Sequence, residues 1–288
     1  MLEAVLQLTA NGLMAGAVLV LPAIGFTTIF AVLRFADFAI AAHMAAGAFG
    51  GYAVNAWLGL PAWMAVTAAF ATAALIGIAS DHVALRPLRG SSALTIAIAS
   101  IALNLMLESA IRFFFGNEPR NYAIPLVRDW TFGPLRVGPQ QLENALIAVV
   151  AMVLVFAFLA FTSTGKAMRA VADNPTLADI KGIDPDRMAR FAVGLGMGLG
   201  GIGGMLIGLD TSIDPSLGFR SLLSVFAASV VGGLGSIPGA VVGGVVIGLA
   251  EELSLLALPP AYKAAVGFFA ILITLSFRPR GLLGASTT

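Results

Sequence analysis

Residues Ser163–Arg190, STGKAMRAVADNPTLADIKGIDPDRMAR, are the stretch on which the assignment of this fold depends. The stretch holds five of the sixteen basic residues and four of the fifteen acidic residues of a chain that is otherwise almost continuously apolar. A polar segment of this length between apolar runs predicts a folded loop in water. We expect it to be a docking element, through which a soluble partner moves the rest of the protein.

The composition is that of an integral membrane protein. Of the 288 residues 59% are hydrophobic and 11% are charged, with a mean hydropathy of +0.95, whereas soluble domains carry about 25% charged residues. The formal charge of +1 and the lack of a basic patch with interleaved aromatic residues argue against a nucleic-acid partner. Because there is no cysteine, disulfides and thiolate metal sites are excluded. The N-terminus lacks the features of a signal peptide, so the first apolar run should remain in the mature protein.

The apolar runs predict an all-α, polytopic membrane helical bundle that forms one domain over residues 1–288. The candidate membrane segments lie at about 11–33, 38–57, 61–80, 93–115, 141–161, 191–209 and 221–277. The last run is too long for one helix and divides at VGGLGSIPG, residues 231–239, and at Pro259-Pro260. Its first piece, 221–233, rises only about 20 Å as an α-helix, so we expect a half-helix or part of a re-entrant hairpin. The total is about eight membrane elements, including the broken or re-entrant segment near 221–239.

The basic residues of short loops set the orientation, because they favour the cytoplasm. Three basic regions fall on one side if 93–115 runs outward: Arg86 with Arg89, the loop 163–190, and Arg278 with Arg280. We therefore expect a cytoplasmic loop at 163–190 and an external loop at 116–140. The N-terminus is external if 11–33 and 38–57 both cross, and cytoplasmic if the chain breaks at mid-membrane near Arg34–Asp37.

Local signals within 163–190 predict two short helices. Asn174 followed by Pro175 is an N-cap with proline at the first helical position, and Gly182 is placed to end that helix. We expect helices from about Lys166 to Ala172 and from Pro175 to Lys181. Leu177 and Ile180 fall on one face of the second helix. Such an apolar face with a charged rim suits a groove on a partner protein, although it also suits packing against the protein's own bundle.

Glycines recur every four residues in the segment 191–209, at Gly196, Gly200, Gly204 and Gly208. On a membrane helix this spacing makes a flat face that another backbone can approach closely. The face either packs tightly or slides during a conformational cycle, and the two roles are compatible.

Five motifs carry a specific resemblance. They are the loop residues Gly165, Ala167, Arg169, Ala170, Ala172, Asn174, Pro175, Ala178, Gly182 and Ile183, followed by Pro215–Gly218, Gly232–Ala240, Glu251 and Arg278–Gly284. In this order they resemble the branched-chain amino acid permease family of bacterial ABC importers, over essentially the whole chain. In that family the loop reads G-x-A-x-R-A-x-A-x-N-P-x-x-A-x-x-x-G-I.

The resemblance implies a membrane subunit in the bacterial inner membrane, surrounded by lipid. Its partners would be a second, related permease (as a heterodimer), two cytoplasmic ATPases and a periplasmic solute-binding protein. The loop would be the coupling element that seats in a groove of an ATPase. The expected ATPase-coupling residues are Gly165, Arg169, Asn174, Pro175, Leu177, Ile180 and Gly182.

One segment departs from the family pattern. The family usually reads I-N-F-A-H-G near the start, whereas this chain has Asp37 in place of Asn and Ile40-Ala41 in place of His-Gly. If that segment lines the pathway, the cargo need not be one of the aliphatic amino acids for which the family is named. The expected cargo is therefore a small polar solute: a branched-chain or other amino acid, an amide, urea or a related organic acid.

Polar residues in apolar segments are candidate pathway residues, because burying them in lipid is costly. The pathway or gate candidates are Asp37, His43, Asn104, Gly232, Gly233, Gly235, Pro238, Gly239 and Glu251. Structural roles compete: an Arg34–Asp37 ion pair, a packed His43, a Glu108–Arg112 pair, and one of Glu251 and Glu252 reaching a polar partner.

The sequence predicts a transport subunit that is not itself an enzyme. No metal-ligand spacing, nucleophile–base–acid set or G-x-x-x-x-G-K-[ST] motif is present, so we expect no metal, no cofactor and no ATP bound by this chain. A secondary, ion-coupled transporter is the alternative; it would use an intramembrane carboxylate such as Asp37, Glu108 or Glu251 and would show inverted repeats, of which none is convincing.

Overall fold

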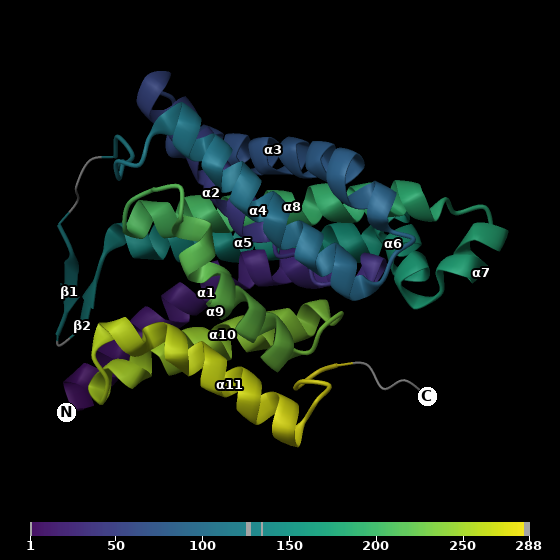
Figure 1. Ribbon diagram of the computed structural model, residues 1–288. Helices are drawn as coiled ribbons and strands as arrows, with labels where there is room; N and C mark the ends of the chain where they lie inside the picture. The colour runs from purple at the N-terminus through teal and green to yellow at the C-terminus, as the bar shows by residue number, and fades with distance from the viewer. Residues whose placement is uncertain (1, 125–127, 134, 285–288) are drawn as a thin grey trace.

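The computed structural model describes residues 2–124, 128–133 and 135–284 and consists almost entirely of helices gathered side by side into one bundle (Figure 1). The α-helices are α1 (Leu2–Leu33), α2 (Ile40–Tyr52), α3 (Ala62–Ser80), α4 (Ala93–Phe115), α5 (Pro139–Phe161), α6 (Ser163–Asp173), α7 (Pro175–Ile180), α8 (Pro185–Asp210), α9 (Leu217–Gly232), α10 (Ile237–Leu253) and α11 (Lys263–Phe277). Short π or 3-10 segments extend α2 to Trp57, α3 to Leu88 and α10 to Leu256, and another, Pro260–Tyr262, precedes α11.

The polytopic bundle predicted from the sequence is confirmed. Seven helices of the described residues are long and apolar enough to cross a membrane, and α9 is a shorter apolar helix. The central helices are α1 and α8, which are mostly buried, whereas α5 and α11 expose most of their surface. The extended structure among the described residues is a two-stranded antiparallel hairpin, β1 (Trp130–Phe132) and β2 (Leu135–Val137), in the loop after α4, together with an isolated bridge between Arg120 and Ile213.

The glycine face of α8 packs tightly against its neighbours. A Cβ atom at Gly196 would lie 2.6 Å from the carbonyl oxygen of Gly25 on α1, and one at Gly204 would lie 2.1 Å from that of Met44 on α2. A Cβ at Gly47 would lie 2.3 Å from the Cα of Gly201. These positions admit no larger side chain without a shift of backbone, so close packing accounts for the glycines of α8.

The segment 38–57, predicted as a membrane element, forms α2 and its π-helical extension, which together cover Ile40–Trp57. The α-helical part of this segment begins at Ile40, ends at Tyr52 and is buried at 11 of its 13 residues. It is packed on several sides, by α3, α4, α8 and α9. Its many Ala and Gly residues suit such close packing.

The N-terminus lies at the end of the bundle that carries the 116–138 loop. Gln7 on α1 donates a hydrogen bond to the Arg136 carbonyl at 2.7 Å, and the Arg136 N–H returns one to Gln7 at 2.8 Å. At the other end of α1, Arg34 has φ +59 and its guanidinium donates to the carbonyl of Ala172 on α6. Thus α1 runs the length of the bundle, from the 116–138 loop to the polar loop (Figure 1). If the 116–140 loop is external, as the sequence predicts, the N-terminus is external too.

The predicted half-helix at 221–233 is longer than expected, since α9 has 16 residues and begins at Leu217. It forms an antiparallel hairpin with α10, as expected, but the turn does not lie free at mid-membrane. The N–H groups of Leu282 and Leu283 donate to the carbonyls of Val231 and Gly232 at 2.8 and 2.9 Å. The segment after the last membrane helix thus satisfies the C-terminal carbonyls of α9, which places the turn at the same end of the bundle as that segment.

Candidate functional site

The polar loop folds into the two helices that the sequence predicts, α6 and α7. The hydroxyl of Thr162 caps α6 by accepting from the Gly165 N–H at 3.0 Å. At Gly165 a Cβ would lie 2.5 Å from the Phe158 carbonyl oxygen and from the Leu159 Cα, so this glycine lets α6 pack on the end of α5. Arg169 is exposed on the same helix. The loop therefore has a fixed position on the bundle.

Both ends of α7 are capped by the residues that predicted it. The Asn174 side chain accepts from the Leu177 N–H at 2.9 Å, and Pro175 occupies the first turn. At the other end Gly182 has φ +82; its N–H donates to the Asp179 carbonyl at 2.8 Å, and the next N–H, of Ile183, donates to the Ala178 carbonyl at 3.0 Å. This paired bonding satisfies carbonyls that the helix end leaves free.

The apolar face of α7 points away from the bundle. Leu177 is 54% exposed and Ile180 is 75% exposed, whereas Ala178 is 4% exposed and makes the contact with the bundle. In Figure 1, α7 projects beyond the ends of the long helices. Packing of Leu177 and Ile180 against the protein's own bundle, which the sequence left open, is therefore not what the fold shows.

An ion-pair network lies at the same end of the bundle. Arg89 contacts the buried carboxylate of Asp81 at 2.7 Å, and Arg86 contacts Asp186 at 2.7 Å. Arg89 also approaches Asp186 to 3.6 Å. The network ties the end of α3 to the start of α8, directly after α7. The sequence marked these arginines only as orientation signals and pointed to neither aspartate, because Arg86 and Asp186 are a hundred residues apart in the chain.

The intramembrane candidates on α2 and α4 hold the start of α2 in place. The side chain of Asn104 accepts from the Ala42 N–H at 2.7 Å, and that of Ser100 from the Phe38 N–H at 3.0 Å. They satisfy N–H groups that a helix start leaves free. His43 bonds the Ala39 carbonyl at 2.7 Å and Ser80 at 3.2 Å, as expected of a packed histidine.

The expected Arg34–Asp37 pair does not form among the described residues. The positive φ of Arg34 directs its side chain to Ala172, while one carboxylate oxygen of Asp37 accepts from the Ala39 N–H at 3.0 Å and the other is buried with no partner among the described residues. The Glu108–Arg112 pair does form, at 2.5 Å.

The glycine-rich turn between α9 and α10 combines tight packing with one open position. A Cβ at Gly232 would lie 2.1 Å from the Gly239 carbonyl oxygen, and one at Gly233 would lie 2.5 Å from the Gly284 nitrogen. Gly235 has φ +88, and a Cβ added there would have no described atom within 4 Å. Pro238 lies in the first turn of α10. Packing explains three of the four glycines.

A cavity of about 530 Å³ opens at the end of the bundle opposite α7, between α1, α8, α9, α10 and α11. Glu251, a pathway candidate, lines it and accepts from the Ser224 hydroxyl at 2.6 Å. Asp210 lines it too and accepts from Asn144 at 2.8 Å. Both carboxylates thus have neutral hydrogen-bond donors. The other lining residues include Val18, Leu19, Ile207, Arg220, Glu252 and Lys263.

Two ion pairs border this cavity. Lys263 pairs with Glu252, and Arg220 contacts Asp214 at 2.5 Å. Partial burial raises the pKa of Asp214, but hydrogen bonds from Arg220 and Ser216 outweigh it and hold the pKa below its usual range.

Both Glu251 and Glu252 have polar partners, where the sequence predicted one. No group of three or more His, Cys, Asp or Glu suited to a metal occurs in the described part of the chain.

Comparison with known proteins identifies the family. Residues 8–275 match the family described as branched-chain amino acid transport system, permease component. The chain is 30% identical to the high-affinity branched-chain amino acid transport system permease protein LivH of Escherichia coli, over 97% of this chain and 95% of LivH. The chain belongs to this permease family.

A relative from another bacterium agrees with this assignment. The permease is 31% identical to the permease protein BraD of Pseudomonas aeruginosa, again over 97% and 95% of the two chains. Among solved structures, PsaBC from Streptococcus pneumoniae in complex with Fab aligns over 94% of this chain and 92% of that one, with 15% identity and a TM-score of 0.48. The family resemblance and the multi-pass membrane architecture predicted from the sequence are therefore confirmed for this permease.

Proposed function

We propose that this permease forms one half of the pore of a bacterial ABC importer in the inner membrane. Its partners are a second, related permease in a heterodimer, two cytoplasmic ATPases and a periplasmic solute-binding protein. The names of the relatives support a branched-chain amino acid as cargo, and another small polar solute, such as an amide, urea or an organic acid, remains compatible with the altered segment around Asp37.

The observation that carries the proposal is the exposed face of α7. A capped helix that presents Leu177 and Ile180 to water beyond the end of the bundle has the shape and chemistry of a helix that inserts into a groove. Full burial of one such side chain contributes about 1.5–3 kcal/mol. The ATPase subunits are the soluble partners that must transmit force to this bundle.

The contacts of the polar loop give a route for that force. Closure of the ATPases on ATP moves α6 and α7 together, since they are joined through the Asn174 cap. Arg34 connects α6 to the end of α1, and Asp186 connects the start of α8 to Arg86 on the extended α3. The bundle then rocks about its central helices and exposes the pathway alternately to the two sides.

In this proposal the pathway candidates have different positions. Glu251 lies in the external cavity, where its carboxylate would meet the ammonium group of an entering amino acid. Asp37, His43 and Asn104 surround the start of α2, near the cytoplasmic end. The turn 231–239 lies at the cytoplasmic end too, and we propose that it acts as a gate there.

The proposed docking is tested by replacing both exposed apolar residues of α7 with Asp, as L177D/I180D. Two charges in an apolar groove oppose burial, so the ATPases should no longer co-purify and transport should be lost, while the permease still inserts. The matched control is S91D/S92D, which adds two charges at exposed serines of the same end of the bundle, outside the polar loop. Co-purification of the ATPases at wild-type yield with L177D/I180D would disprove the docking.

A further inference from the structure

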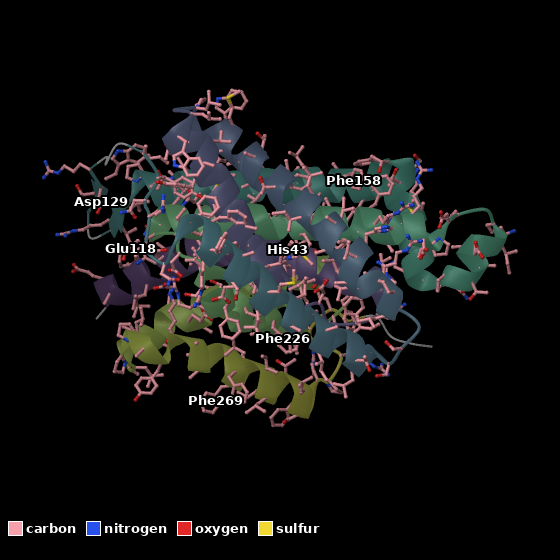
Figure 2. The ribbon with its side chains drawn as sticks, turned by 45° about the horizontal axis from the view of Figure 1, so that its top comes forward. His43, Glu118, Asp129, Phe158, Phe226 and Phe269 are labelled. Atoms are coloured by element: carbon pink, nitrogen blue, oxygen red, sulfur yellow. The ribbon has the colours of Figure 1, made fainter. Side chains whose placement is uncertain are left out.

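A second hollow, distinct from the external cavity, lies on the side of the bundle. It is a groove of about 520 Å³ between α3, α5 and α8. Its walls include Phe70 and Ile78 from α3 and Leu154 and Phe158 from α5, and Arg190 is the one charged side chain among the described residues that line it. Figure 2 shows Phe158 toward the α6–α7 end of the bundle, away from the end marked by Glu118 and Asp129.

The floor of the groove is formed by α8, and Gly194 is the glycine that lines it. A Cβ at Gly194 would lie 2.9 Å from the Cδ1 of Ile78, and one at Gly198 would lie 2.5 Å from the ring of Phe70. Because these two positions carry no side chain, Ile78 and Phe70 of α3 pack directly against the backbone of α8. The rest of the apolar surface stays open: Leu154 is 63% exposed and Phe191 is 43% exposed.

The length of the groove matches one leaflet of a bilayer. It extends along α8 from Arg190 to Ile202, which is about 18 Å at the helical rise of 1.5 Å per residue. The hydrocarbon core of a bilayer is about 30 Å thick, so one leaflet accounts for about 15 Å. Because Arg190 lies at the end of the bundle that carries α6 and α7, the groove spans the inner leaflet.

Two guanidinium groups lie at the inner end of the groove. Arg190 lines it, and the Arg187 guanidinium lies over the ring of Phe191, 5.9 Å from the ring centroid. Neither forms an ion pair with another described residue. The nearest acidic neighbour in sequence, Asp186, is bound by Arg86 and interacts with Arg190 electrostatically at longer range. Neither Arg187 nor Arg190 is neutralised by a direct ion pair, so both can contact an anion at the level of the headgroups.

We propose that this groove binds an anionic phospholipid of the inner leaflet. One acyl chain lies between α3 and α5, against the surface of α8, and the phosphate contacts Arg187 and Arg190. An apolar channel of leaflet length that ends in arginines has the chemistry of an anionic lipid site. A transmembrane helix of another subunit would fill the apolar channel but would not require the two arginines.

Native mass spectrometry of the purified full-length permease tests the proposal. The protein is stripped of lipid in detergent and then titrated with phosphatidylglycerol or phosphatidylcholine. The wild type should retain phosphatidylglycerol in preference to phosphatidylcholine. In R187A/R190A the retention of phosphatidylglycerol should fall about thirtyfold, as expected for two lost cationic contacts of about 1 kcal/mol each.

The apolar half of the site is tested by Ala74→Phe, which fills the groove, and it should reduce the retention of both lipids. Two controls leave the groove intact: Ala71→Phe, at an exposed position of the same helix, and R278A/R280A, which removes two arginines at the same end of the bundle. Unchanged retention in R187A/R190A or in Ala74→Phe would overturn the proposal. Equal retention of the two lipids by the wild type would overturn it as well.

A single cysteine at Leu154 distinguishes the lipid from a protein occupant, since the natural chain has no cysteine. In membranes that contain the assembled transporter, this cysteine should react with a lipid-soluble maleimide and should not cross-link to another subunit. A cross-link to a neighbouring subunit would assign the groove to a protein contact and contradict the lipid site.

Discussion

At the scale of single residues, polar side chains inside the bundle serve different purposes at different places. Asn104 and His43 are engaged in bonds that hold the start of α2. In contrast, Glu251 faces a cavity and accepts a hydrogen bond from a hydroxyl of α9. A carboxylate bonded by a neutral donor in a cavity is suited to bind a cationic group. Among the intramembrane candidates, Glu251 is therefore the residue we expect to contact cargo.

Replacement of Glu251 by Gln tests this role. Gln retains the size of the side chain and can still bond Ser224, but it removes the charge that would attract an ammonium group. We expect the apparent KM for uptake of a labelled branched-chain amino acid to rise about tenfold, as for loss of one charge-assisted hydrogen bond. The control is Glu143→Gln on the exposed face of α5. An unchanged KM with Glu251→Gln would exclude Glu251 from the pathway.

At the scale of elements, the two short helices of the polar loop and the α9–α10 turn differ in how far sequence could predict them. The ends of α7 follow from Asn174, Pro175 and Gly182, which act within a few residues of one another. The position of the α9–α10 turn at one end of the bundle depends on Leu282 and Leu283. Their N–H groups donate to the carbonyls of Val231 and Gly232 from a distant part of the chain. Local caps are readable from sequence, whereas a contact between distant segments is not.

The turn provides a test of its proposed role as a gate. At Gly235 a side chain has room but would be strained by the positive φ, whereas at Gly239 it would lie 2.4 Å from the Gly232 carbonyl oxygen. Gly239→Val should therefore lower the thermal stability of the purified permease, by about 1–3 kcal/mol of overpacking. Gly235→Val should leave assembly intact and reduce uptake, if the turn must move.

The two substitutions separate packing from gating. Normal uptake in Gly235→Val at wild-type expression would remove the gate assignment. A wild-type melting temperature in Gly239→Val would contradict the close α9–α10 contact instead. Because the two outcomes concern different residues, one can fail without the other.

At the scale of the whole molecule, the bundle has two chemically different ends. One end carries the N-terminus, the β1–β2 hairpin and the polar cavity, and the other end carries α6, α7, the Asp81–Arg89–Asp186 network and the α9–α10 turn (Figure 1). Sequence predicted the number and order of the long helices, because each apolar run reports its own span. The sequence did not predict the cavity, because Asp210, Arg220 and Lys263 each lie near the end of a different helix. Charged residues at such positions are also typical of helix ends at the membrane surface.

The seating of α7 in an ATPase is the step on which the proposed transport cycle depends, and cross-linking from Ile180 tests it most directly. The natural chain has no cysteine, so Ile180→Cys provides a unique thiol on the exposed face of α7, and Ser91→Cys provides a control at the same end of the bundle. In membranes that contain the complete importer, a short cross-linker that joins a thiol to an amine should link Ile180→Cys to a lysine of an ATPase subunit. It should give much less ATPase adduct with Ser91→Cys. If Ile180→Cys remains freely labelled and forms no adduct with the ATPase, α7 is not the coupling helix.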